Sequence, residues 1–217
     1  MSSIDPDLRR YYAERAPYYD AVYAKPERAA DLAFLHDWVP AQFEGKRVLE
    51  VACGTGYWTP RIAARAREVV ATDATAEPLA FARLRPGAES VRFLEADAYD
   101  LPANLGAFDG AYAGLWLSHV PRKRLPAFFA GLHARLVPGA VVVLVDNNEV
   151  QLKDFPIAET DADGDTFQHR VSREGVTHRV LKNFPTGADL ESLVAGAAGG
   201  IEYRNLDNFW TLRYRLR

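Results

Sequence analysis

Hydrophobic positions along the chain follow two periodicities that alternate. Short runs of aliphatic and β-branched residues are typical of buried strands, and longer segments with apolar residues three and four apart are typical of helices. The runs that indicate strands are residues 47–51, 69–73, 91–96, 108–113 and 141–146. The segments that indicate helices are residues 31–38, 75–83 and 125–137. This alternation predicts an α/β fold with a parallel, doubly wound sheet, whose strands present their carboxyl ends at one ligand-binding edge.

Two regions depart from the alternation. Residues 8–23 predict an N-terminal helix that is rich in tyrosine. Residues 151–184 follow the fifth strand, and within them the strand patterns of 167–172 and 176–181 flank a turn, which predicts a β-hairpin. After a further helix at 186–194, the chain ends in two strand patterns within 202–217. The final strand has no crossover helix before it, so it must pair antiparallel at or near a sheet edge.

The 217 residues fit a single domain with four parts. We expect an N-terminal helical lid over 1–40 and a ligand-binding core over 45–146. A substrate-side insertion then covers 151–184, and the C-terminal helix and edge strands cover 186–217.

Charge and composition narrow the class of protein. The 26 Lys and Arg residues against 29 Asp and Glu give a net charge of −3, which offers no basic field for nucleic acid. The single Cys53 excludes an intrachain disulfide. No apolar run approaches the ~20 residues of a membrane helix, and the start carries no signal-peptide pattern. We therefore expect a cytoplasmic monomer or homodimer that binds neither nucleic acid nor membrane.

The strongest motif joins a hydrophobic strand directly to Gly54-Thr55-Gly56 and then to a helix. Glycines let the chain turn tightly and let backbone approach a ligand, and the unpaired N–H groups of the helix start favour an anion. A dinucleotide site would have a third glycine at position 59, where Thr59 stands. The alternative is a tight strand–helix turn without a ligand.

Two acidic residues lie at the ends of the next strands. Asp73 ends the second strand, where a carboxylate can accept both hydroxyls of a ribose. Asp97 ends the third strand and is followed by Ala98, so the pair can bind an exocyclic amine and a ring nitrogen. The alternatives are a helix N-cap for Asp73 and an ordinary loop acid for Asp97.

In this order, the segment from Glu50 to Gly56, Asp73, Asp97 with Ala98, and the segment 136–140 resemble the motifs of class I S-adenosylmethionine-dependent methyltransferases, over about residues 45–146. The resemblance implies a Rossmann-like seven-stranded sheet with an antiparallel last strand. It also implies S-adenosylmethionine as cofactor and S-adenosylhomocysteine as product. The cofactor-binding residues expected are Tyr12, Tyr19, Glu50, Ala52, Gly54, Gly56, Trp58, Asp73, Ala74, Asp97, Ala98 and Gly114.

A narrower likeness extends over nearly the whole chain. Residues 11–20, 54–59 and 116–121 are similar to small bacterial natural-product O-methyltransferases, including those that methylate phosphonates. This likeness implies a small-molecule acceptor. A sulfonium favours aromatic faces, and the candidates are Tyr12, Tyr18, Tyr19 and Trp58. Aromatic residues at helical spacing more often pack in a core.

Three residues are candidates for the chemistry. His119 follows the fourth strand and can act as a base, bind the acceptor or orient the next helix. Arg170 and Lys182, in the insertion, can hold an anionic acceptor such as a carboxylate or phosphonate, which needs no general base. Asp146, Asn147 and Asn148, after the fifth strand, are equally well placed, and an asparagine there can orient a substrate or form a turn.

Alternatives remain open at this level. Methyl transfer to nitrogen or carbon is not separated from transfer to oxygen. A nicotinamide-dependent oxidoreductase would use a similar sheet, and a protein that binds the nucleotide without catalysis would keep the same motifs. The histidines and aspartates of the insertion match no calcium or zinc spacing, so we expect no metal.

Overall fold

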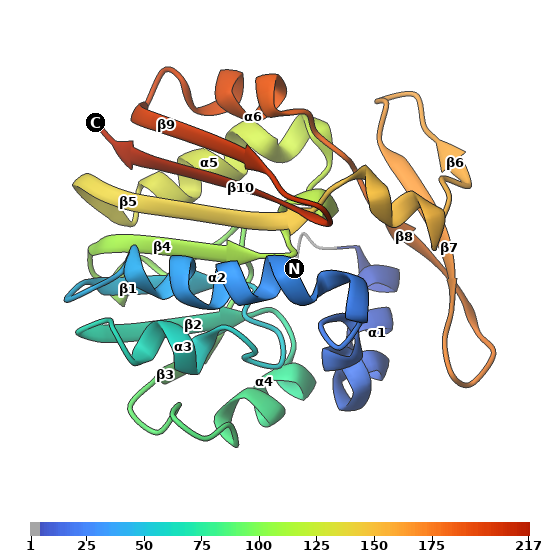
Figure 1. Ribbon diagram of the computed structural model, residues 1–217, viewed down its shortest axis with the longest axis horizontal. Coiled ribbons are helices and arrows are strands. Elements are labelled where there is room, and N and C mark those ends of the chain that lie inside the picture. The colour runs from blue at the N-terminus through green and yellow to red at the C-terminus, as the bar shows by residue number, and fades with distance from the viewer. Residues whose placement is uncertain (1–4) are drawn as a thin grey trace.

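The computed structural model describes residues 5–217 and contains a large and a small β-sheet (Figure 1). The first four residues of the expected lid segment lie outside the described part of the chain. The large sheet has the strand order β3-β2-β1-β4-β5-β10-β9. Its strands are β1 (Arg47–Val51), β2 (Glu68–Asp73), β3 (Arg92–Glu95), β4 (Phe108–Gly114), β5 (Leu136–Asn147), β9 (Ala198–Asn205) and β10 (Phe209–Leu216).

The direction of the strands confirms the doubly wound arrangement. Strands β1 to β5 pair in parallel, with β1 between β2 and β4, so the chain winds outward in both directions. Strand β10 runs antiparallel between β5 and β9, as expected for a last strand that follows its neighbour through a short turn. The resulting sheet is Rossmann-like, and the carboxyl ends of β1 to β5 lie at one edge.

Helices cover both faces of the large sheet. On one face, α2 (Ala29–Ala41) and α3 (Thr59–Ala63) bury Leu35 and Ile62. On the other, α5 (Leu125–His133) and α6 (Gly187–Val194) bury Phe128 and Leu190. Helix α4 (Ala76–Arg83) connects β2 to β3. Two apolar clusters form the buried core, and they hold the strands in position.

The single helix expected over residues 8–23 is wrong, because the structure has two helices there. Helix α1 (Pro6–Arg15) ends, and a 3-10 helix, η1 (Ala16–Val22), continues in another direction. Pro17 accounts for the break, because proline lacks the N–H that an α-helix needs and its ring clashes with the preceding turn.

The expected end of the helix over 125–137 is also wrong. Helix α5 ends at His133, and Leu136 already pairs with Phe108 as the first residue of β5. Pro138 and Gly139 therefore lie within the strand, where the pairing with β4 shifts register between Phe108 and Gly110. A Pro-Gly pair marks an irregularity in an edge portion of a strand as readily as it ends a helix.

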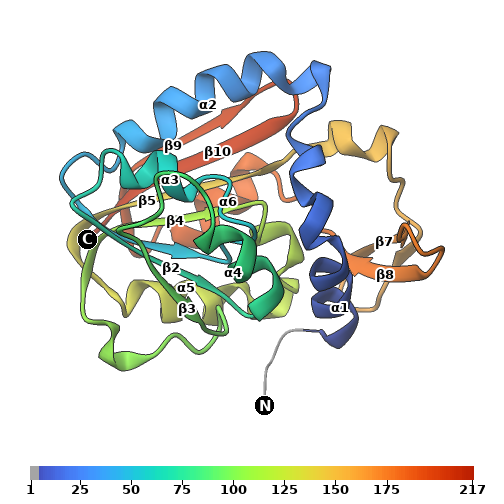
Figure 2. The same cartoon turned by 90° about the horizontal axis from the view of Figure 1, so that it is seen from below.

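The small sheet contains the expected hairpin. Strands β7 (Thr166–Val171) and β8 (Thr177–Leu181) pair antiparallel, and a short β6 (Glu159–Thr160), which the pattern did not predict, pairs with β7. The small sheet lies beside α1 at the end of the large sheet (Figures 1 and 2).

Phe209 and Trp210 are buried and complete the core of the large sheet. Over residues 5–217, no helix has the length and apolar character needed to cross a membrane.

Candidate functional site

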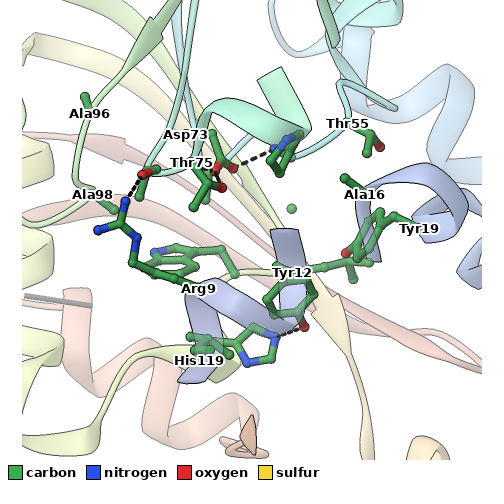
Figure 3. A pocket seen from close by; sticks show the side chains of 18 residues that line it. Arg9, Tyr12, Ala16, Tyr19, Thr55, Asp73, Thr75, Ala96, Ala98 and His119 are labelled. Atoms are coloured by element: carbon green, nitrogen blue, oxygen red, sulfur yellow. Dashed lines mark hydrogen bonds between the residues drawn. The ribbon is translucent and has the colours of Figure 1, made fainter. Parts of the chain in front are cut away.

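A large cavity of about 710 Å³ opens at the carboxyl ends of β1, β2 and β4. Helix α1 and η1 close its outer side (Figure 3). The cavity is lined by Leu8, Arg9, Tyr12, Ala16, Tyr19, Ala52, Gly54, Thr55, Asp73, Ala74, Thr75, Pro78, Ala96, Ala98, Gly114, Leu115, Trp116 and His119. This set contains eight of the twelve residues expected to bind a cofactor.

The turn after β1 has the backbone conformation that the glycine motif predicts. Ala52, Gly54 and Gly56 have positive φ values of 53°, 55° and 73°. A Cβ on Gly54 would meet no atom within 4 Å, so this glycine keeps backbone open toward the cavity. A Cβ on Gly56 would lie 2.9 Å from the Cβ of Ala82, so Gly56 instead permits α4 to pack closely against the turn.

Asp73 links the ends of β1 and β2 at the cavity wall. One carboxylate oxygen accepts the N–H of Gly54 at 2.9 Å, and the other accepts the N–H and the hydroxyl of Thr75 at 3.1 and 2.9 Å. Burial raises the pKa of Asp73, against these hydrogen bonds. Thr75 is the N-cap residue of α4, but its side chain makes no hydrogen bond to the helix, because its hydroxyl donates to Asp73 instead.

The end of β3 contributes small side chains. Ala96 and Ala98 line the cavity, whereas Asp97 does not line it and accepts the N–H of Tyr99 at 2.9 Å. The expected role of Asp97 at an exocyclic amine therefore stays a prediction, and the contact of the neighbouring Ala98 with the cavity is what the structure shows.

Three other expected residues lie behind the cavity wall. Glu50 is buried at the end of β1, where burial raises the pKa of its carboxyl to about 8. Trp58 packs with α2 and α3 on one face of the sheet, which is the core position given above as the alternative to a contact with the sulfonium. Gly56 supports the turn from below. All three shape the site without lining it.

The end of β4 is the most constrained backbone in the site. A Cβ on Gly114 would lie 2.6 Å from the hydroxyl of Tyr112, so only glycine fits there. The next residue, Leu115, has a positive φ of 57°, which is uncommon for a side chain with Cβ. Both residues line the cavity, and the sequence pattern did not indicate the strain at Leu115.

Polar contacts of Arg9 and Asp20 help to hold the lid segments α1 and η1 to the core. The guanidinium of Arg9 donates to the carbonyl of Ala74 at 2.7 Å (Figure 3). Asp20 of η1 accepts from the hydroxyl of Thr55 at 2.8 Å and also from Arg85. These contacts fix Tyr12 and Tyr19, which α1 and η1 place at the cavity wall.

His119 is buried between the lid and the small sheet. Its Nδ1 lies 2.6 Å from the carbonyl of Leu181, which can only accept, so Nδ1 carries the proton and donates. The Nε2 therefore accepts the hydroxyl of Tyr12 at 2.7 Å (Figure 3). Burial, together with the charge of Lys182, lowers the pKa of His119 to about 3. A neutral His119 thus fixes the hydroxyl of Tyr12.

A small pocket of about 260 Å³ adjoins the large cavity. The two share Tyr12, Tyr19, Leu115 and His119 as wall. The remaining lining residues of the small pocket are Arg15, Val22, Asn147, Gln151, Arg170 and Lys182. All three residues expected to carry the chemistry, His119, Arg170 and Lys182, thus line one space.

Lys182 forms a buried ion pair in the small pocket. Its Nζ donates to Asp146 at 2.9 Å and to the hydroxyl of Ser118 at 2.6 Å. Burial, which Asp146 offsets only in part, lowers the pKa of Lys182 to about 8. Burial opposes ionisation of Asp146 too, but the charge of Lys182 keeps the pKa of that carboxyl below its usual value.

Arg170 is a buried guanidinium without an acidic partner. Its side chain is 4% exposed and donates from Nε and Nη2 to the amide oxygen of Gln168, at 3.1 and 2.6 Å. No ion pair among residues 5–217 includes it. Gln168 and Arg170 lie on one face of β7, as strand alternation requires. The exposed His169, on the other face, pairs with Glu159.

Sequence reasoning missed Arg15 and Gln151 of the small pocket. Arg15 ends α1 and donates to the hydroxyl of Tyr11, with no acidic partner in the described residues. Gln151 lies in the 3-10 helix η6 (Glu149–Lys153) after β5. Arg15 lies within the segment 11–20 that carries the family likeness, but that likeness gave it no role, and Gln151 belongs to no motif. Only the folded contact between the lid, β5 and the small sheet brings the two residues together.

The large cavity fits S-adenosylmethionine. Gly54 presents open backbone, Asp73 presents a carboxylate, Ala96 and Ala98 leave flat apolar wall, and Tyr12 and Tyr19 present aromatic rings. The carboxylate suits a ribose, the flat apolar wall suits an adenine, and the aromatic rings suit a sulfonium. Among residues 5–217 no group of three or more His, Cys, Asp and Glu side chains is arranged to hold a metal.

Comparison with known proteins agrees with this geometry. The family described as a methyltransferase domain matches residues 48–139. The chain belongs to the class I S-adenosylmethionine-dependent methyltransferases. Within that class, its fold is similar to two structures of DhpI. A DhpI-SAH complex is 28% identical with TM-score 0.80 and covers 97% of this chain and 95% of its own. A DhpI-SAM-HEP complex is 30% identical with TM-score 0.79 and covers 98% and 100%.

Curated sequences match over a shorter region. An uncharacterized methyltransferase of Synechocystis is 31% identical over 102 residues, which are 47% of this chain and 47% of that protein. The chain spans about half or less of the length of the first curated relatives it matches. Family membership removes the nicotinamide oxidoreductase as an alternative.

Proposed function

We propose that the protein transfers a methyl group from S-adenosylmethionine to an oxygen of a small anionic acceptor, a carboxylate or a phosphonate. The observation that carries this proposal is Arg170, a buried guanidinium in the small pocket that has an amide but no carboxylate as partner. A guanidinium of this kind is suited to bind two oxygens of a carboxylate or phosphonate at once.

The charges around the small pocket favour an anion. Arg15, Arg170 and Lys182 line it, while the nearest buried acid, Asp146, is already bound to Lys182 and to the N–H groups of Ser118 and Asn147. Positive charge is therefore in excess where water is largely excluded. In such surroundings, an anionic ligand is held more strongly than it is at an exposed site.

The shared wall of the two spaces supports a reaction at their junction. S-adenosylmethionine supplies an electrophilic methyl group when bound in the large cavity. Arg170 and Lys182 would hold the acceptor so that one of its oxygens faces the large cavity past Tyr12 and Leu115. Transfer in line requires reacting atoms about 3–3.5 Å apart, so much of the catalysis is positioning. The lid excludes water from this junction.

No general base is needed for this acceptor. A carboxylate or phosphonate oxygen is already ionised at neutral pH. The low pKa of His119 keeps it neutral, and its Nε2 is occupied by the hydroxyl of Tyr12. We therefore assign His119 to positioning Tyr12 at the junction, and Lys182 in its protonated form to acceptor binding.

Arg170→Met tests the proposal, since methionine keeps much of the buried volume. Methyl transfer is measured with labelled S-adenosylmethionine and panels of small carboxylates and phosphonates, and S-adenosylhomocysteine binding is measured by calorimetry. We expect the variant to bind S-adenosylhomocysteine like the wild type and to lose at least about 100-fold in kcat/KM. The matched control is Arg179→Met, in the same hairpin, whose exposed guanidinium pairs with Glu159.

The product distinguishes the acceptor types. Label released as methanol by mild base identifies a carboxyl ester, whereas base-stable label from a phosphonate identifies a monoester. Equal activity of the Arg170 and Arg179 variants would contradict the anion site. Transfer to neutral amines or carbon acids alone would favour the N- or C-methyltransferase alternative. Binding of S-adenosylhomocysteine without any transfer would favour a binding protein.

Several expectations about the whole protein remain part of this proposal. We propose a small-molecule acceptor and no nucleic-acid or membrane partner, a monomeric or homodimeric state, and a cytoplasmic location. A sedimentation measurement checks the oligomeric state.

A further inference from the structure

The small pocket also contains hydrogen-bond acceptors that the anion site does not use. The amide oxygens Oδ1 of Asn147 and Oε1 of Gln151 are both buried and have no hydrogen-bond partner among residues 5–217. Asn147 is 2% exposed and Gln151 is 7% exposed. Buried polar atoms are normally paired, so two unpaired acceptors in one pocket call for a donor.

The orientation of Asn147 is set by its neighbour. Its Nδ2 lies 3.5 Å from Oδ1 of Asp146, and its backbone N–H donates to the same oxygen at 2.8 Å. A reversed amide would turn an oxygen toward the carboxylate, which is repulsive. The Oδ1 of Asn147 is therefore the end that points away from Asp146.

The adjacent Asn148 shows what a structural asparagine looks like here. Its Nδ2 donates to Asn205 Oδ1 at 3.2 Å and to the carbonyl of Leu206 at 2.9 Å, and its Oδ1 accepts the N–H of Val150 at 3.1 Å. Asn148 thus joins β5 to the β9–β10 turn and leaves no acceptor over. Asn147, one residue earlier, lines the pocket and keeps its acceptor unpaired.

We propose that Asn147 and Gln151 are specificity-determining residues, and that they select acceptors carrying an uncharged hydrogen-bond donor, a hydroxyl group, in addition to the anionic group. This rests on the proposed function, because it takes the small pocket as the acceptor site. An ammonium group is disfavoured as the donor, since Arg15, Arg170 and Lys182 already bring excess positive charge to the same pocket. The small pocket is the lesser of the two adjoining spaces, so short acids are the probes suited to it.

The test compares matched acids with chains of two to four carbons. Each set consists of an alkyl carboxylate or alkylphosphonate, its ω-hydroxy form and its ω-amino form, titrated by calorimetry into wild-type protein saturated with S-adenosylhomocysteine. If the buried amide oxygens accept a hydrogen bond from a hydroxyl, an analogue that lacks this hydroxyl binds less tightly, because the oxygens then stay unpaired. We expect at least one hydroxy acid to bind about ten-fold or more tightly than its alkyl partner, and more tightly than its amino partner.

Asn147→Leu and Gln151→Leu remove the amide oxygens with similar volume. We expect each to reduce the ratio of hydroxy to alkyl affinity toward one while affinity for the alkyl acid is kept. Gln42→Leu is the control, because this amide lies away from the pocket and binds Arg213 and the carbonyl of Trp38. A merely structural role would lower affinity for both members of a pair alike.

The outcomes separate this inference from the proposed function. Equal binding of alkyl and hydroxy acids by the wild type overturns the inference and leaves the anion site standing. A hydroxyl preference that persists in both leucine variants also overturns the inference. The same holds if the ω-amino acids bind more tightly than their ω-hydroxy partners. If no acid of any series binds, the anion site fails and the inference fails with it.

Discussion

The large cavity and the small pocket share a wall but are built differently. The large cavity is made mostly of backbone turns and small or apolar side chains at the ends of β1 to β4, with Asp73 as its carboxylate. The small pocket is made of long polar side chains from α1, η6, β7 and the residue after β8. The core of the fold therefore provides the nucleotide site, and the added segments provide most of the site that we propose for the acceptor.

This difference shows where variation can be accommodated. A change at Gly56 or Gly114 would force a Cβ against backbone or a buried ring, so the large cavity tolerates little. Arg15, Gln151 and Arg170 stand on a lid, a 3-10 helix and a small sheet, which can change without disturbing the large sheet. We expect substitutions on the two sides to separate cofactor affinity from acceptor affinity.

The largest effect is expected from Asp73→Ala. The change removes the carboxylate that lines the large cavity and leaves the N–H of Gly54 without its acceptor. Affinity for S-adenosylhomocysteine, measured by calorimetry, should fall about 100-fold or more. The matched control is Glu77→Ala, an exposed acid in the first turn of α4. Equal affinity of the two variants would show that Asp73 is only structural.

The next effect concerns pH and the small pocket. Lys182 has its pKa lowered to about 8, so it is charged below that pH and neutral above it. The proposed function assigns acceptor binding to the charged form, so kcat/KM should decline about ten-fold per pH unit above about pH 8, while binding of S-adenosylhomocysteine changes little.

A double variant sharpens that prediction. Lys182→Met with Asp146→Asn removes both charges of the buried pair, so that no carboxylate is left unpaired. It should have a low kcat/KM without the decline near pH 8. An unchanged decline in this variant would assign the titration to another group.

The same comparison explains how far sequence reasoning reached. Strand ends, glycine turns and Asp73 are each specified by residues within a few positions, and the topology then brings them to one edge. The pair of Tyr12 and His119 is separated by 107 positions and depends on how α1 docks. The strain at Leu115 and the polar set of the small pocket likewise depend on contacts between distant segments, which no local pattern encodes. The break at Pro17, in contrast, is a local effect of proline that the sequence itself carries.

A smaller effect is expected at the junction. Tyr12→Phe removes the hydroxyl that His119 holds, and His119→Leu removes the group that holds it. Each should lower kcat about ten-fold, and the double variant should lower it no further, because both changes break one unit. Wild-type kcat/KM should show no ionisation between pH 6 and 7, since His119 stays neutral there. An acid limb in this range that disappears in His119→Leu would make His119 a base.

The smallest effect concerns the lid. Arg9→Ala removes the hydrogen bond to the carbonyl of Ala74. The dissociation rate of S-adenosylhomocysteine, measured by stopped flow, should rise about three- to ten-fold. Arg10→Ala is the control, because the neighbouring Arg10 is exposed and contacts Asp7 of the same helix. A similar rate in both variants would show that Arg9 does not restrain the lid.

The position of α1 and η1 has a kinetic consequence. These segments close the outer side of the large cavity, and they also supply Tyr12, Arg15 and Tyr19 to the small pocket. In the proposed function, the same two segments therefore enclose the nucleotide and complete the acceptor site. We expect ordered binding, with S-adenosylmethionine first and the acceptor second, and release of the methylated product before S-adenosylhomocysteine. In steady-state kinetics, S-adenosylhomocysteine then competes with S-adenosylmethionine but not with the acceptor.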